Sequence, residues 1–114
     1  MSEIRRKSMA QTSRFIERVE AECKGYGLTL ISPRDGQLRG GQVSFAHESG
    51  YPIMQALISR GVIGDFRTPN ILRFGFSPLY VSFADIDRAA ATFAEILRTG
   101  AWRSPEFAEK QTVT

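Results

Sequence analysis

Residues 71–76 of the chain, ILRFGF, alternate between two kinds of side chain and predict a β-strand. In an extended strand, the leucine and the two phenylalanines point to one face, and the isoleucine, Arg73 and the glycine point to the other. The first face is typical of a strand that packs on a core. Arg73 is the exception in this pattern, because it places a guanidinium on a stiff backbone between two apolar residues.

The rest of the sequence supplies further strands and helices around this one. Residues 42–47 (QVSFAH) also alternate, and with the β-like residues 28–32 they predict an antiparallel pair. A weaker β-like run stands at 79–81, and residues 64–70 (GDFRTPN) are expected to form a loop. The main elements are helix, strand, strand, helix, strand and helix, at residues 3–24, 28–32, 42–47, 49–61, 71–76 and 82–100. This order predicts a two-layer α+β domain, with helices on one face of a small, mainly antiparallel sheet.

Apolar side chains at three- and four-residue spacing predict the buried face of each helix. The residues expected on these faces are Ile4, Ser8, Thr12, Phe15, Ile16, Val19 and Cys23 in the first helix, Ile53, Met54, Leu57 and Ile58 in the second, and Phe83, Ile86, Ala90, Phe93 and Leu97 in the third. Ser82, with Asp85 three residues later, matches the capping-box pattern at a helix N-terminus. The first helix is expected to leave apolar surface uncovered, at Ile4 and Met9 in its first half and at Phe15 and Ile16, and so to form a two-fold homodimer.

Composition limits the classes of function. The chain has 114 residues, 42% of them hydrophobic, and a net charge of +3, which are ordinary values for one globular domain. The positive charge is scattered apart from residues 5–7 (RRK), so no nucleic-acid partner is expected. A single cysteine excludes an intrachain disulfide and a multi-cysteine zinc site. Without a membrane-spanning run or a signal peptide, the protein is expected to be cytoplasmic, with no membrane partner.

Arg73 is the candidate functional residue, and two interpretations of it stand. As a functional group, its planar guanidinium matches a carboxylate, so Arg73 would bind an anionic or carboxylate ligand. As a structural group, it would pair with Asp65 or with an acidic residue of a neighbouring strand. Among the other reactive side chains, Cys23 is expected to be a small core residue and His47 a surface residue. The sequence contains no nucleotide-binding, metalloprotease or nucleophile-elbow motif.

Three stretches of the sequence resemble the kynureninase family. Residues 39–47 (RGGQVSFAH) look like the strand that opens the second half of that family's small domain. Residues 61–67 (GVIGDFR), followed by 71–80 (ILRFGFSPLY), are similar to the family's C-terminal signature. The resemblance runs over the whole chain, but it covers only the family's C-terminal small domain.

The resemblance implies a fold, an activity and a partner. The fold is the small domain of the aspartate-aminotransferase fold, pyridoxal-phosphate fold type I. The activity is the hydrolysis of L-kynurenine to anthranilate and L-alanine in tryptophan degradation. The partner is a large domain, missing here, that holds pyridoxal phosphate. Residues 1–25 would then lead in from the large domain, 26–101 would form the small-domain core, and 102–114 a polar tail. By the same resemblance, Arg73 binds the α-carboxylate of L-kynurenine.

The chain alone is expected to be inactive and to bind no pyridoxal phosphate. Aldimine chemistry needs a desolvated lysine, and Lys7, Lys24 and Lys110 do not stand in the family's cofactor-lysine context. Three arrangements remain open. The chain is a fragment of the parent enzyme, one chain of a split enzyme, or a stand-alone binding module that has lost the chemistry.

Overall fold

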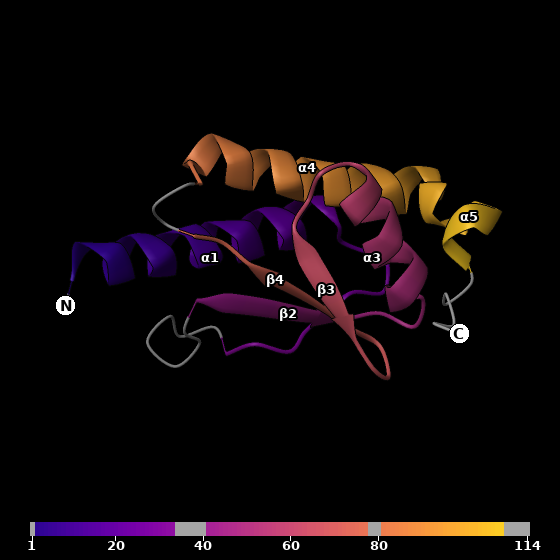
Figure 1. Ribbon diagram of the computed structural model, residues 1–114, viewed down its shortest axis with the longest axis horizontal. Coiled ribbons are helices and arrows are strands. Elements are labelled where there is room, and N and C mark those ends of the chain that lie inside the picture. Colours follow the sequence, from indigo (N-terminus) through magenta and orange to yellow (C-terminus); the bar gives the residue numbers. More distant parts are fainter. Residues whose placement is uncertain (1, 34–40, 78–80, 109–114) are drawn as a thin grey trace, which may run out of the picture.

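The computed structural model describes residues 2–33, 41–77 and 81–108, and it shows helices packed on a small sheet (Figure 1). The elements are α1 (Glu3–Glu22), β1 (Thr29–Leu30), β2 (Gln42–Ala46), α3 (Gly50–Ser59), β3 (Gly64–Arg67), β4 (Ile71–Gly75), α4 (Phe83–Thr99), the 3₁₀ turn η1 (Ala101–Arg103) and α5 (Pro105–Ala108). The four strands form one antiparallel sheet in the order β1-β2-β4-β3. The predicted α+β class and the antiparallel pairing of β1 with β2 are confirmed.

The core lies between the helices and one face of the sheet. Figure 1 shows α1 and α4 side by side on the same side of the strands. Alternate residues of the two central strands point toward these helices and are at most 1% exposed, namely Val43, Phe45, Leu72 and Phe74. The ring of Phe74 lies 5.0 Å from that of Phe15 on α1 and 5.4 Å from that of Phe93 on α4, measured between centroids. The alternation in residues 71–76 therefore reflects one covered and one uncovered face, as predicted.

Helix α4 begins and ends at the predicted residues. The backbone N–H of Asp85 donates to Ser82 Oγ at 3.1 Å, and the backbone N–H of Ser82 donates to Asp85 Oδ2 at 2.9 Å. This reciprocal pair is the capping box that the sequence predicted. Gly100 ends the helix with a φ of 72°, a left-handed conformation that glycine adopts without strain.

The predicted buried faces extend too far at the helix ends. Ile58 and Phe83 were predicted on the buried faces but are exposed, whereas the exposure of Ile4 agrees with the uncovered apolar surface expected in the first half of α1. Ile4 and Phe83 lie in the first turns of α1 and α4, and Ile58 lies in the last turn of α3. Sequence periodicity marks the correct side of a helix but not how far along it the neighbouring elements reach.

Phe15 and Ile16 belong to the chain's own core, so the prediction that they lie on an uncovered dimer surface is wrong. Phe15 is fully buried and Ile16 is 5% exposed. The ring centroids of Phe45, Phe74 and Phe76 lie 6.3, 5.0 and 5.0 Å from that of Phe15. Gln11, one turn earlier, is also fully buried, and its Nε2 donates to the carbonyl of Val81 at 2.6 Å. This bond ties α1 to the segment that leads into α4.

Residues 64–67 form a strand, which corrects the predicted loop at 64–70. β3 pairs with β4 along its whole length, and Phe66 stands opposite Leu72 on the covered face. The sequence of β3 hides this, because a glycine and two charged residues flank its one apolar side chain. Gly64 is required by close packing, since a Cβ there would lie 2.9 Å from the carbonyl oxygen of Arg73 and from Met54 Cε.

The C-terminal part of the described chain packs back on α3. Trp102 in η1 and Phe107 in α5 are partly buried against the core. The β-like run predicted at 79–81 lies mostly outside the described residues. Within the described ranges, no helix has both the length and the apolar character needed to cross a bilayer.

Candidate functional site

The sheet register places Arg73 in the middle of the uncovered face. Arg73 stands opposite Ser44 of β2 on one side and Asp65 of β3 on the other. Because successive side chains alternate along a strand, these three residues share the face opposite Leu72 and Phe74. We call this the open face, defined by Ser44, Asp65 and Arg73. The helices pack on the other face, and the three residues of the open face are partly exposed.

Arg73 forms a bidentate ion pair with Asp65. Its Nε donates to Asp65 Oδ1 at 3.0 Å, and its Nη2 donates to Oδ2 at 2.7 Å. The side chain of Arg73 is 29% exposed, and that of Asp65 is about half exposed. Two parallel bonds of this kind fix the plane of the guanidinium as well as its position.

The bidentate pair uses only one edge of the guanidinium. Arginine has five N–H groups, and the two bonds to Asp65 take the Nε–H and one hydrogen of Nη2. The second hydrogen of Nη2 and both hydrogens of Nη1 are not used by this pair. This hydrogen of Nη2 and one hydrogen of Nη1 form the end-on edge of the guanidinium, which has the geometry to bind another carboxylate through two bonds.

The two interpretations of Arg73 therefore concern different edges of one side chain. The structural alternative, pairing with Asp65 of a neighbouring strand, is present in the structure. Binding of a ligand carboxylate stays a prediction, and it is compatible with the pair because it needs only the end-on edge. Sequence reasoning named Asp65 as a partner but placed it in a loop; the alternation of β3 is too weak to show the shared face.

Sequence reasoning missed Arg67, which extends the charged cluster. Its Nε lies 3.7 Å from Asp65 Oδ2, and its side chain is exposed. Two guanidinium groups and one carboxylate leave this cluster with a net charge of +1. An electropositive cluster favours an anionic ligand. Arg67 ends the stretch 61–67 (GVIGDFR) singled out in the sequence, but its contact with Asp65 follows only from the strand that brings the two residues together.

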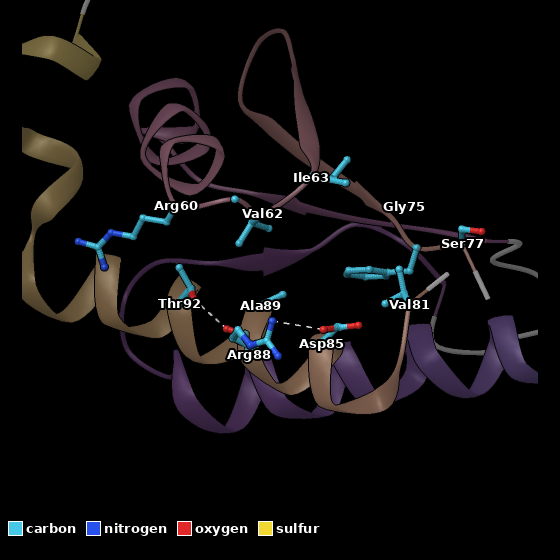
Figure 2. A pocket seen from close by; sticks show the side chains of 12 residues that line it. Arg60, Val62, Ile63, Gly75, Ser77, Val81, Asp85, Arg88, Ala89 and Thr92 are labelled. Carbon is cyan, nitrogen blue, oxygen red and sulfur yellow. Dashed lines mark hydrogen bonds and ion pairs between the residues drawn. The ribbon is translucent and has the colours of Figure 1, made fainter. Parts of the chain in front are cut away.

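A separate cavity of about 520 Å³ lies beside the end of β4, between residues 60–63, which follow α3, and helix α4 (Figure 2). Its lining includes Val62, Gly75 and Val81 but not Arg73. Figure 2 shows the side chains of Arg88 and Asp85 directed at one another, and Arg88 Nη1 lies 3.3 Å from Asp85 Oδ1. Asp85, the acidic residue of the cavity lining, thus already accepts a hydrogen bond from Ser82 in the helix cap and pairs with Arg88. The cavity shows no group that points to a ligand, and we assign no chemistry to it.

His47 is buried, so the prediction of a surface histidine is wrong. His47 is 8% exposed, and both nitrogens of its ring have hydrogen-bond partners. The backbone N–H of Ser49 donates to Nδ1 at 2.9 Å, so Nε2 carries the hydrogen and donates to the carbonyl of Tyr26 at 2.8 Å. A polar ring satisfied in this way is stable inside a fold. His47 therefore has a structural role at the corner between β2 and α3.

Cys23 is a core residue, as predicted. It is 3% exposed and follows the last turn of α1. Burial raises the pKa of its thiol to about 12, and the charge of Glu22 acts in the same direction. The thiolate is the reactive form of cysteine, so this residue is not an activated nucleophile. Within residues 2–33, 41–77 and 81–108, no three His, Cys, Asp or Glu side chains are grouped to hold a metal ion.

The fold and the site together define a class: a small α+β domain with a paired arginine on the uncovered face of an antiparallel sheet. The family model for the kynureninase C-terminal domain matches residues 4–93 of the chain. The chain therefore belongs to the kynureninase C-terminal domain family.

Curated relatives agree with this assignment. The chain is 55% identical over 114 residues to the kynureninases of Burkholderia mallei (strain SAVP1) and Burkholderia pseudomallei (strain K96243). It is 48% identical over 114 residues to the kynureninase of Pseudomonas fluorescens. Each match covers all of this chain and 27% of the relative. The chain thus spans about a quarter of the length of these proteins.

The described residues do not by themselves fit pyridoxal phosphate, the cofactor that the family implies. An aldimine needs a lysine in a desolvated site. Lys7 and Lys24 are exposed, one on the first half of α1 and one just after its end. Lys110 lies outside the described residues.

Proposed function

We propose that the chain is the C-terminal domain of a kynureninase in which Arg73 binds the α-carboxylate of L-kynurenine. The whole enzyme hydrolyses this substrate to anthranilate and L-alanine in tryptophan degradation. The domain has the small-domain part of the aspartate-aminotransferase fold, pyridoxal-phosphate fold type I. Arg73 holds the carboxylate and so orients the amino-acid part of the substrate, which lowers the barrier by removing unproductive orientations.

The observation that carries this proposal is the end-on edge of Arg73 on the open face. The bidentate pair with Asp65 leaves that edge free of the pair, on a side of the sheet that the helices do not cover. Membership in the family supports the proposed reaction of the whole enzyme. The similarity of residues 71–80 to the family signature supports the proposed role of Arg73.

The proposal includes a partner for the open face and a place for the cofactor. A large domain, beyond the part of the relatives that this chain matches, holds pyridoxal phosphate and contributes the reactive lysine. That group supplies the electron sink for the reaction when it is bound. The chain without the large domain is inactive.

The proposal also covers the assembly and its setting. The enzyme works in the cytoplasm, in keeping with its unpaired thiol at Cys23. The homodimer predicted from the sequence remains part of the proposal, with an interface that excludes Phe15 and Ile16.

The test is the substitution Arg73→Lys in the assembled enzyme. By assembled enzyme we mean this chain joined to the rest of a kynureninase, either its own or that of the Burkholderia mallei relative. Lysine keeps the charge but loses the planar edge with two donors. Loss of a charge-assisted hydrogen bond costs about 1.5–3 kcal/mol, so kcat/KM for L-kynurenine is expected to fall roughly tenfold to a hundredfold.

Arg14→Lys is the matched control for this experiment. Arg14 forms a bidentate pair with Asp87 on the helix side, with nitrogen–oxygen distances of 2.7 and 2.8 Å. The same chemical change there is expected to alter kcat/KM by less than about twofold. If Arg73→Lys also left kcat/KM unchanged, Arg73 would be a structural residue and the proposed role would fail.

A further inference from the structure

We propose that Asp65 is a positioning residue for Arg73: its side-on bonds fix the guanidinium so that the end-on edge faces the ligand carboxylate. This inference rests on the proposed function of Arg73. The structure supports it through the arrangement of β3 and β4, the division of the guanidinium into two edges, and the charge of the cluster.

The backbone of the sheet sets the distance between Asp65 and Arg73. The two residues are directly opposite each other in the register of β3 and β4. Directly opposed side chains start about 5 Å apart, so a short aspartate reaches the middle of a long arginine side chain without a change of backbone. Gly64 precedes Asp65 and lets β3 approach β4 and Met54 closely. The register of β3 and β4 thus sets the distance between the two side chains of the pair.

The side-on pair restricts the rotation of a flexible side chain. An unpaired arginine on a sheet samples many rotamers, and a ligand would have to immobilise it on binding. With Nε and Nη2 held by Asp65, the remaining donors already lie in one plane. A ligand carboxylate therefore meets a preorganised edge, which is the condition for tight and oriented binding.

Charge balance explains how an aspartate next to the site is tolerated. A carboxylate beside Arg73 weakens the attraction of that arginine for an anion. Arg67 offsets this effect, since its guanidinium lies 3.7 Å from the same Asp65 oxygen and brings the cluster to a net charge of +1. The open face keeps a positive potential while Asp65 fixes the geometry.

The test is the substitution Asp65→Asn in the assembled enzyme. Its effect is measured with L-kynurenine and with an inhibitor that lacks the carboxylate. Asparagine keeps the size of the side chain but cannot accept from both arginine nitrogens with a charged group. We expect kcat/KM for L-kynurenine to fall about tenfold, mainly through a rise in KM. The inhibitor is the amine that corresponds to L-kynurenine without its carboxylate. Its inhibition constant should stay unchanged in Asp65→Asn. A merely structural role of Asp65 would affect both ligands alike.

Asp87→Asn is the matched control, because it disrupts the bidentate pair with Arg14 on the helix side and should leave both constants unchanged. If Arg73→Lys lowers kcat/KM but Asp65→Asn does not, the positioning role is wrong and the proposed function stands. If Arg73→Lys has no effect, the proposed function itself fails. A lower KM in Asp65→Asn would show that Asp65 competes with the ligand, which would also overturn the positioning role.

A second measurement does not depend on enzyme activity. In nitrogen-15 NMR spectra of the isolated chain, the Nε–H of Arg73 should exchange with water more slowly than that of Arg88, whose side chain is 73% exposed. Equally fast exchange at both residues would contradict a held guanidinium. The same spectrum of Asp65→Asn should show faster exchange at Arg73 alone.

Discussion

Two arginine–aspartate pairs in this molecule have almost the same geometry but lie in different layers. On the helix side, Nε and Nη2 of Arg14 donate to Asp87 at 2.7 and 2.8 Å. On the open face, the same two atoms of Arg73 donate to Asp65 at 3.0 and 2.7 Å. Both pairs are only partly buried, and both use the side-on edge of the guanidinium.

The surroundings of the two pairs differ. Arg14 on α1 and Asp87 on α4 bridge two packed helices, and Arg14 also lies 5.9 Å from the centre of the Phe83 ring. The Arg73 pair joins two strands that backbone hydrogen bonds already hold together. A bidentate pair between helices adds to their packing, whereas the same pair within a sheet adds little to an existing contact. The comparison indicates that the role of such a pair depends on what the unpaired end-on edge of its guanidinium faces.

The strongest test of this comparison is to reverse each pair. Exchanging the two residues, Arg73→Asp with Asp65→Arg, keeps an ion pair but moves the guanidinium by about 5 Å to the next strand. It also puts a carboxylate where the ligand carboxylate would bind. We expect kcat/KM of the assembled enzyme to fall by more than about a hundredfold, while the melting temperature of the isolated chain changes little.

The reversed helix pair, Arg14→Asp with Asp87→Arg, is the control for that experiment. It should leave kcat/KM within about twofold of the parent, because this pair does not face a ligand. Similar losses of activity from both exchanges would mean that the two pairs do not differ in role. Unfolding of the isolated chain by the strand exchange would show that the pair in the sheet is needed for stability.

A second prediction tests whether strand geometry controls the pair on the open face. In Gly64→Ala, the new methyl group would lie 2.9 Å from the Arg73 carbonyl oxygen and from Met54 Cε, so β3 must shift. We expect a loss of about 1–3 kcal/mol in the free energy of unfolding, measured by urea denaturation. Gly75→Ala is the matched control, since its nearest contact would be Gln42 Cγ at 3.8 Å. Equal stability of the two variants would contradict the close packing of β3.

The smallest predicted effect concerns the pH dependence of the helix pair. The hydrogen bond from Arg14 lowers the pKa of Asp87 below its ordinary value of 3.8. A lowered pKa in the folded state means that the stabilisation is present above pH 3.8 and is lost as the pH falls through the lowered value. Asp87→Asn should therefore make the stability of the isolated chain less dependent on pH in this acid range. Identical pH profiles in urea denaturation would contradict this.

The sequence predicted those parts of the fold that depend on local signals. Ser82 with Asp85 marks the start of α4, Gly100 marks its end, and the alternation around Arg73 separates the two faces of β4. Each of these signals depends on residues close together in the sequence. They also sufficed to predict an antiparallel sheet with helices.

The parts that could not be predicted depend on contacts between distant segments. β3 is a strand because β4 offers it a hydrogen-bonding edge, not because of its own composition. His47 is buried because Tyr26 and Ser49 satisfy its ring. In the candidate site, the sequence named both Arg73 and Asp65. The edge of the guanidinium that Asp65 occupies follows only from the register of the two strands.

The strand order β1-β2-β4-β3 has a consequence for aggregation. A sheet with two free edges invites other chains to add strands, especially where an edge is long, flat and apolar. Here one edge is β1, which has only two residues, and the other is β3, a four-residue strand that carries Asp65 and Arg67. Proline follows at position 69 and lacks the N–H that a continuing ladder would need. The charged cluster on the open face thus also protects the sheet against the growth of intermolecular β-structure.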